Sequence, residues 1–147
     1  MTMLSPSEVA QALHDRFNAG DMEGVYALWA PDIRYASPGV RIEGQAARIA
    51  AEQAWVTAFP GAQNSSIRKA VDGNTVVEEV AFTGSHTGPL VTPEGTVPAT
   101  NRALDGRLIS WLVIKDGLVV EQTITFDRAD LLTQLGVLPA ASAKAAA

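Results

Sequence analysis

The spacing of apolar residues changes once along this chain, close to Gly61, and the change decides its fold class. Before this point apolar residues recur every three or four positions, as Val9, Leu13 and Phe17 do, which is typical of amphipathic helices. After it, β-branched residues alternate with polar ones, as in strands. Helices followed by a run of strands predict an α+β fold in which the sheet curls over the helices to bury one face.

Three helices are expected in the first part. Ser5 can cap the first, Asp21 the second, and the third spans residues 45–58. The apolar stripe of the second helix runs as far as Trp29, and Pro31 ends it. A short strand at 32–35 and a turn at 37–39 precede the third helix.

Four strands are expected in the second part, at residues 63–71, 76–86, 102–114 and 119–126, joined as an antiparallel meander that forms a cone. A loop at 88–98, rich in proline and glycine, is long enough to serve as a lid or pocket rim. The cone's mouth is expected between this loop and the first helix. Residues 1–139 form one domain, and 140–147 are an alanine-rich tail.

Composition narrows the class of partner. The formal net charge is -5 without a basic cluster, which disfavours nucleic acid and anionic membranes. No run of eighteen apolar residues and no signal peptide is found, so the cytoplasm is the expected compartment. The chain has no cysteine, which excludes disulfides and thiolate chemistry.

Asp127 is the first catalytic candidate, because it lies where the last strand gives way to a final helix. A carboxylate there would lie at the rim of any cavity that the sheet encloses. The alternative is that Asp127 simply caps the helix by accepting a backbone N–H. Both interpretations can hold at once.

A set of short motifs, in order over about residues 9–136, resembles the SnoaL-like polyketide cyclases. These belong to the nuclear-transport-factor-2-like group, with the ketosteroid isomerases and limonene epoxide hydrolases. The motifs are Phe17 to Asp21, Phe59-Pro60, Gly84 to Gly88, Pro98-Ala99-Thr100, Asp116-Gly117, and Asp127 with Leu131 to Gly136. The resemblance implies a cone of curved antiparallel sheet closed by helices, an apolar pocket, no cofactor and a small hydrophobic polyketide-like substrate. It also implies a homodimer through the sheet, for which Ile124 and Phe126 are the expected outward residues.

The resemblance also implies proton transfer by a carboxylate, and sometimes a histidine, during an aldol-type ring closure. Asp127 matches the family aspartate, and burial would raise its pKa toward that of a useful base. His86 lies in the Gly84 to Gly88 motif, on the strand face of Phe82, and could share the proton; otherwise it is a structural histidine. His14 is expected on the polar, exposed side of the first helix.

Asp105 is a second carboxylate, with Arg107 beside it. A three-residue hairpin with a bulge at Asp116-Gly117 would pair Asp127 with Asp105 on one face and give an acid–base cluster. A two-residue turn would put them on opposite faces and leave Asp105 as a solvated charge.

The residues expected to contact substrate are large aromatics and nearby polar groups, although aromatics at core spacing are more often only core. They are Trp29, Tyr35, Trp55, Phe82, Arg107, Trp111, Thr123 and Thr125.

Two departures from the family pattern, at Ala36-Ser37-Pro38 and Glu121-Gln122-Thr123, remove usual pocket groups. They leave open a cyclase that works by folding its substrate, as in a cycloaddition or ether closure. An isomerase-like or epoxide-hydrolase-like enzyme, or a binding module without catalysis, is the alternative.

Overall fold

The structure, a computed structural model, describes residues 2–139, so the predicted tail at 140–147 lies outside the described residues. Four helices and eight strands follow one another within residues 2–139. The helices are α1 (Pro6–Asn18), α2 (Met22–Tyr26), α3 (Gln45–Ala58) and α4 (Arg128–Gln134). The strands are β1 (Trp29–Ser37), β2 (Val40–Glu43), β3 (Gln63–Asp72), β4 (Thr75–Ser85), β5 (Leu90–Thr92), β6 (Gly95–Val97), β7 (Ala103–Lys115) and β8 (Leu118–Phe126).

Side-chain caps begin the helices where the sequence predicts them. Ser5 accepts a hydrogen bond from the backbone N–H of Glu8, and the Glu8 carboxylate accepts one from the backbone N–H of Ser5. Asp21 caps α2 by accepting from the N–H of Gly24. These bonds satisfy N–H groups that have no partner within the helix. The expected bounds of the third helix, 45–58, are confirmed by α3.

The second helix is shorter than predicted, and the first strand is longer. α2 ends at Tyr26, and Trp29 already belongs to β1, where it pairs with Val119 of β8. The pairing is irregular between Trp29 and Arg34, around Pro31, which has no N–H to donate to a neighbouring strand. Pairing with a strand ninety positions later outweighs the local helical pattern, because it places Trp29 and Ile33 in the core.

The main sheet has six strands in the order β2-β1-β8-β7-β4-β3, and β5 and β6 form a separate small hairpin. The predicted meander of β3, β4, β7 and β8 is confirmed. β1 pairs with β8 in the parallel direction and all other neighbours are antiparallel, so the sheet is mixed. The fold is α+β, as expected.

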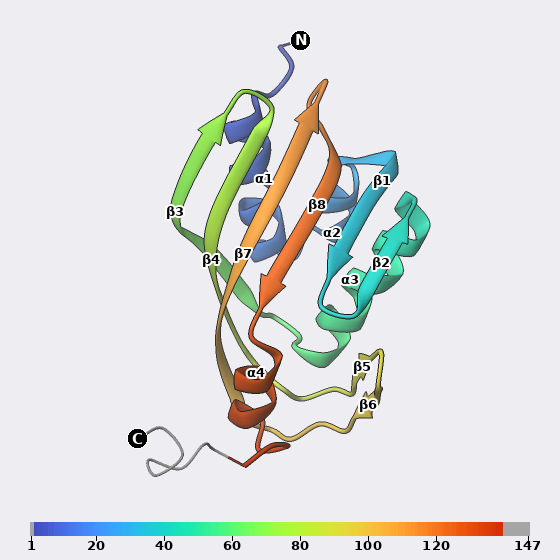
Figure 1. Cartoon of the computed structure of the whole chain (residues 1–147), viewed down its shortest axis with the longest axis vertical. Coiled ribbons are helices and arrows are strands. Elements are labelled where there is room, and N and C mark those ends of the chain that lie inside the picture. The colour runs from blue at the N-terminus through green and yellow to red at the C-terminus, as the bar shows by residue number, and fades with distance from the viewer. Residues whose placement is uncertain (1, 140–147) are drawn as a thin grey trace.

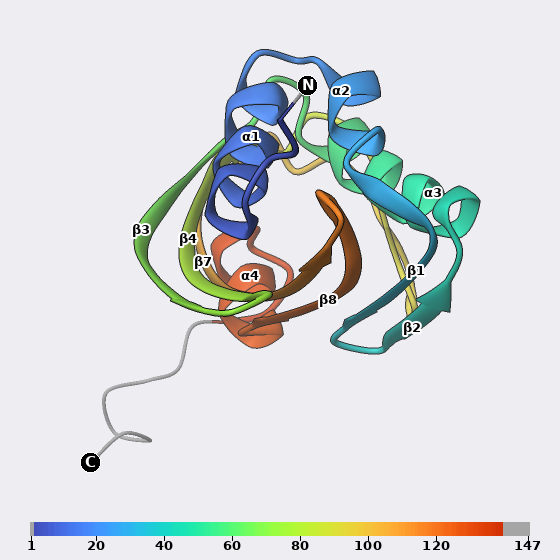
Figure 2. The same ribbon diagram turned by 90° about the horizontal axis from the view of Figure 1, so that it is seen from above.

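The sheet curls around the N-terminal helices, which Figure 2 shows end-on. α1, α2 and α3 lie on its concave side, and α4 covers one end of β7 and β8 (Figure 1). Two buried apolar clusters result. One joins α1 and α2 to the sheet through residues such as Val9, Ile33 and Leu112, and the other joins the end of α3 to α4 through residues such as Phe59 and Leu131.

The β7–β8 hairpin adds a register change that the sequence does not reveal. Its turn has two residues, Asp116 and Gly117, both with positive φ, as a tight hairpin requires. Beyond the turn, Ile114 pairs with Val119 but Val113 pairs with Glu121, so Val120 is an extra residue in β8. Such a bulge reverses the side of the sheet on which each later residue of β8 lies relative to β7.

Candidate active site

A cavity of about 350 Å³ lies between the two apolar clusters and is lined by members of both. Its lining comes from α1, α2, α3, the strands β1, β3, β4, β7 and β8, and the start of α4. The wall is mainly apolar or aromatic, and eleven of its 27 residues have polar or charged side chains. Among the residues that the structure describes, none from 88–98 lines the cavity. The expectation that this loop rings the mouth is therefore wrong, because Leu90 packs into the core beside α3 instead.

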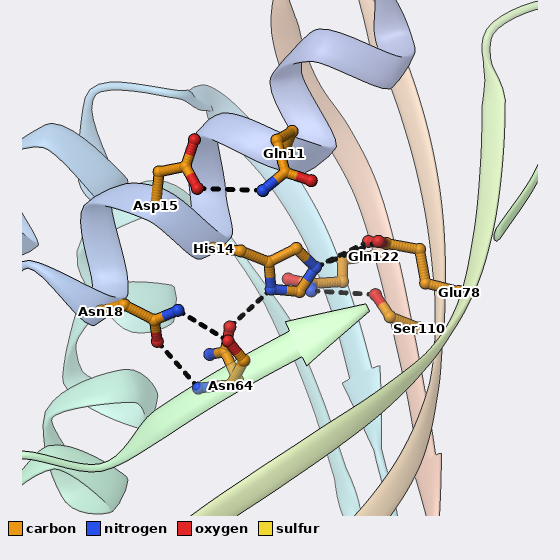
Figure 3. A network of polar contacts seen from close by, with 8 residues as sticks. All are labelled: Gln11, His14, Asp15, Asn18, Asn64, Glu78, Ser110 and Gln122. Carbon is orange, nitrogen blue, oxygen red and sulfur yellow. Dashed lines mark hydrogen bonds and ion pairs between the residues drawn. The ribbon is translucent and has the colours of Figure 1, made fainter. Parts of the chain in front are cut away.

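The strongest polar feature of the wall is a buried imidazole–carboxylate pair (Figure 3). His14 of α1 lies with Nε2 3.0 Å from Oε2 of Glu78 on β4. On the other side of the ring, Nδ1 lies 2.5 Å from Oδ1 of Asn64 on β3. Both ring nitrogens thus face oxygen atoms, an arrangement that is satisfied when both carry a hydrogen.

The ionisation of the two groups is shifted in opposite directions. Burial by itself lowers the pKa of His14, but hydrogen bonds to Glu78 and Asn64 and the carboxylate charge outweigh it, so the pKa is raised above 6.5. Burial would raise the pKa of Glu78, but the hydrogen bond to His14 and its charge outweigh burial, and the pKa is lowered below 4.5. Both shifts favour the imidazolium–carboxylate form of the pair.

The expected exposure of His14 is wrong. Its position four after Ala10 and three before Phe17 puts it on the apolar face of α1, and only 9% of it is exposed. Glu78 was not among the candidates, although it alternates with Val76 and Val80, which point inward on β4. A charged residue at an inward strand position was the sequence signal for this site.

A second buried charge lies across the cavity wall. Arg48 of α3 is 3% exposed, and its Nη1 donates to Glu52 Oε2 at 3.0 Å. Its Nη2 donates to Gln122 Oε1 of β8 at 3.1 Å, and Gln122 Nε2 donates to Ser110 Oγ of β7 at 3.4 Å. Two rings pack on the guanidinium, with Cζ 4.3 Å from the Trp29 centroid and 4.0 Å from that of Tyr35.

The opposite part of the cavity is walled by aromatic rings. Trp55 meets Phe82 and Phe126 edge to face, at centroid distances of 6.2 and 5.8 Å, and stacks on Phe59. Of the predicted substrate contacts, Trp29, Tyr35, Trp55 and Phe82 all line the cavity. The arrangement can bind a flat or flexible apolar molecule and present it to two charged pairs.

The sequence profile of the SnoaL-like polyketide cyclases matches residues 7–135. This chain belongs to the SnoaL-like polyketide cyclase family. No curated protein sequence matches the chain. Among solved structures, AclR, a proposed hydroxylase from Streptomyces galilaeus, has a TM-score of 0.80 at 23% identity and covers 95% of this chain and 85% of its own.

Two further structures share the fold. IdmH, a proposed polyketide cyclase from Streptomyces antibioticus, has a TM-score of 0.75 at 25% identity over 91% of this chain and 100% of its own. A ketosteroid isomerase-like protein from Catenulispora acidiphila has a TM-score of 0.73 at 12% identity over 92% of this chain and 96% of its own. These likenesses support the nuclear-transport-factor-2-like architecture of this SnoaL-like chain.

Asp127 lies at the exposed rim of the SnoaL-like cavity and caps α4, with Oδ1 3.0 Å from the backbone N of Asp130. Asp105 and Arg107 also lie at the rim. Their side chains are 70% and 54% exposed and pair with each other at 2.6 Å. Asp105 is therefore a solvated charge, as expected for a two-residue turn, and not part of a buried acid–base cluster. The burial that the acid–base hypothesis for Asp127 required is absent.

Neither of the two hairpins considered from the sequence has the register that β7 and β8 adopt. The turn has two residues, but Leu108 pairs with Phe126 because of the bulge at Val120. Continued by one residue, this register brings Asp127 level with Arg107, and Asp105 points to the same side as both.

His86 is fully buried outside the cavity. Phe59 stacks on its ring at 5.3 Å, and its Nδ1 lies 2.9 Å from Thr100 Oγ1, while Nε2 has no partner among the described residues. Burial lowers the pKa of His86, so the ring is neutral at neutral pH. The contact between His86 and Thr100 joins the two ends of the 86–100 segment. This contact fits the structural histidine that the sequence offered as an alternative.

Three predicted contacts do not reach the cavity. Trp111, Thr123 and Thr125 are exposed on the outer side of the sheet, because inward positions on β7 and β8 are taken by Ser110, Leu112, Gln122, Ile124 and Phe126. The expected outward placement of Ile124 and Phe126 is wrong for the same reason. Within residues 2–139 no helix is long and apolar enough to cross a membrane, and no three potential ligands from His, Asp or Glu gather as a metal site.

Proposed function

We propose that this protein catalyses an aldol-type ring closure in a small, flexible, carbonyl-rich substrate of natural-product biosynthesis. One observation carries the proposal: a buried His14–Glu78 pair opens onto a largely apolar cavity. Such a cavity can fold an apolar chain so that its two reacting carbons meet. The pair supplies a base and an acid at the same place, as proton transfer during the reaction requires.

The aldol-type ring closure needs no oxidant, reductant or cofactor. A base removes a proton from the carbon between two carbonyl groups, and the electron pair moves onto the carbonyl oxygen as an enolate. The enolate carbon then bonds to a second carbonyl carbon, whose oxygen takes up a proton. In this scheme Glu78 takes the proton from the carbon, and His14 donates its Nε2 proton to the oxygen of the second carbonyl. Transfer of the proton from Glu78 to His14, whose atoms lie 3.0 Å apart, then restores the starting pair.

A synthetic linear triketo ester tests the proposal, because it can close to a ring by the same chemistry. We expect the protein to accelerate closure and to narrow the set of ring products. Glu78→Gln and His14→Gln keep the size and much of the hydrogen bonding. Each should lower the rate by roughly two to four orders of magnitude, the usual contribution of acid–base catalysis.

Matched controls separate chemistry from folding. Thr125→Val changes a polar group of β8 that points away from the cavity and should keep the full rate. Normal rates in both Glu78→Gln and His14→Gln would remove the acid–base mechanism. No acceleration by the wild-type protein would favour a binding module.

A cyclase that acts only by folding its substrate, in a cycloaddition or an ether closure, is the second candidate. The aromatic wall of Trp55, Phe82 and Phe126 favours it, because rigid rings shape a flexible chain. Such an enzyme would tolerate both glutamine variants but lose rate when Phe82 is replaced by Ala.

A further inference from the structure

Arg48 has more hydrogen-bond donors than the described residues use. A guanidinium carries five N–H groups. Two of these donate to Glu52 and Gln122, and the Nε atom is buried with no acceptor among residues 2–139. A buried cation with unused donors is costly unless an acceptor meets it. The surplus therefore indicates an oxygen atom supplied from the cavity that Arg48 lines.

Two aromatic rings hold this guanidinium in place. Trp29 and Tyr35 lie about 4 Å from Cζ and pack against the planar group. Packing of this kind fixes the plane of an arginine and leaves its N–H edge for ligand atoms. The donors are thus oriented before any ligand arrives.

Gln122 and Ser110 extend the row of donors toward β7. Gln122 uses its carbonyl oxygen on Arg48 and one N–H on Ser110, which leaves its second N–H. Ser110 Oγ accepts that bond, so its own hydrogen can point into the cavity. All three side chains are at least nine-tenths buried and line the cavity.

We propose that Arg48, Gln122 and Ser110 form an oxygen-binding subsite that selects neutral β-diketones and stabilises their enolate. The subsite rests on the proposed function for its role in ring closure, whereas the selection of diketones is a binding property of its own. An acceptor oxygen bound here receives N–H and O–H donors from buried side chains, which stabilise developing negative charge more strongly than water-exposed donors do.

The register of the sheet places the subsite beside the acid–base pair. Ser110 of β7 lies directly opposite Glu78 of β4, and both point inward. Side chains paired in this way start about 5 Å apart at Cβ. A carbonyl oxygen held by Ser110 therefore brings its neighbouring carbon within reach of Glu78 or His14.

The net charge of the buried side chains favours a neutral diketone over a carboxylate as the ligand of the subsite. Arg48 is neutralised by Glu52 and His14 by Glu78, so the buried groups carry no net charge before substrate binds. A substrate carboxylate would add an unbalanced negative charge among buried side chains, which is costly. A neutral diketone becomes negative only when its proton moves to the His14–Glu78 pair, and the sum of charges is then unchanged.

Binding of benzoylacetone and of butylbenzene tests the subsite, because the two share a carbon skeleton and only the first has carbonyl oxygens. The Trp111→Phe protein leaves Trp29 and Trp55, both in the cavity wall, as the fluorescent reporters. We expect benzoylacetone to bind at least about tenfold more tightly, the equivalent of one hydrogen bond to a charged group. Near-ultraviolet absorption should show more of its enolate when bound than when free.

Ser110→Ala and Arg48→Lys should each weaken benzoylacetone binding by about tenfold and leave butylbenzene binding nearly unchanged. Thr125→Val, on the outer side of β8, should change neither. Equal losses for both ligands would assign Arg48 and Ser110 a structural role only. A wild-type protein that does not prefer the diketone would overturn the proposal. If Arg48→Lys does not fold, Ser110→Ala decides by the same criteria.

His14→Gln separates this subsite from the proposed ring closure. It should keep the preference for benzoylacetone while it loses exchange of the central diketone proton with deuterated solvent, followed by NMR. A wild-type protein that prefers benzoylacetone but does not close the triketo ester would support the subsite and reject the proposed function. A wild-type protein that closes the ring but does not prefer benzoylacetone would support the proposed function and reject the subsite.

Discussion

His14 and Glu78 are 64 positions apart in the chain, yet Nε2 of one lies 3.0 Å from Oε2 of the other inside the cavity wall. The contact ties α1 to β4 and removes both groups from water. Its chemistry and its contribution to stability can be measured separately.

Stability should depend on pH through this pair. The raised His14 pKa gives stabilisation that is complete below 6.5 and lost as pH rises through the folded-state pKa. The lowered Glu78 pKa gives stabilisation that is present above 4.5 and lost as pH falls through its folded-state pKa. The pair therefore stabilises most between pH 4.5 and 6.5.

His86 acts in the opposite direction, because its lowered pKa makes folding less favourable as pH falls below 6.5. The pair is isolated by subtracting the stability of His14→Gln from that of the wild type at each pH, using urea unfolding. A flat difference between pH 5 and 8 would contradict the raised pKa of His14.

Removing one member of the pair should cost more than removing both. Glu78→Ala leaves His14 buried without its carboxylate and should lower the free energy of unfolding by about 3 kcal/mol or more. The double variant His14→Leu with Glu78→Leu replaces both charges by apolar groups and should lose less. Urea unfolding of His14→Leu, Glu78→Leu and the double variant gives the coupling energy. A double variant that loses at least as much stability as Glu78→Ala alone would contradict the prediction.

The sequence predicted the elements whose signals are local. Ser5 and Asp21 mark helix starts through bonds to residues three positions on, and the position of the turn at Asp116-Gly117, but not its length, follows from side chains that tolerate positive φ. Gly61 separates the helical part from the four-strand meander, as expected. The α+β class and the curled sheet follow from these features together.

What the sequence did not reveal depends on distant partners. Trp29 continues a helical stripe but pairs with Val119, and the extra residue Val120 changes which side of the sheet later residues of β8 occupy. One bulge thus moved Ile124 and Phe126 into the cavity and Thr123 and Thr125 out of it. Glu78 was missed because an inward glutamate is unusual and is explained only by His14.

The outer side of the sheet should mediate a homodimer. Ile109 and Trp111 are 42% and 49% exposed there, next to Thr123 and Thr125, in place of the pair first expected. An exposed apolar patch on a sheet is favourable when a second copy covers it. We expect a dimer by sedimentation at micromolar concentration, and a monomer for Trp111→Lys with unchanged circular dichroism. A wild-type monomer would contradict the arrangement.

Substitution of Asp127 tests whether the proton is transferred at the rim of the cavity or at the buried His14–Glu78 pair. Its side chain accepts the N–H of Asp130 at 3.0 Å, and asparagine can accept the same bond without titrating. We therefore expect Asp127→Asn to keep both stability and ring-closure rate, and Asp127→Ala to lose about 1 kcal/mol of stability. The measurements are thermal unfolding and closure of the triketo ester, beside Glu78→Gln in the same assay. If Asp127→Asn is slowed by two or more orders of magnitude while Glu78→Gln is normal, proton transfer belongs to the exposed aspartate, as the family resemblance implies.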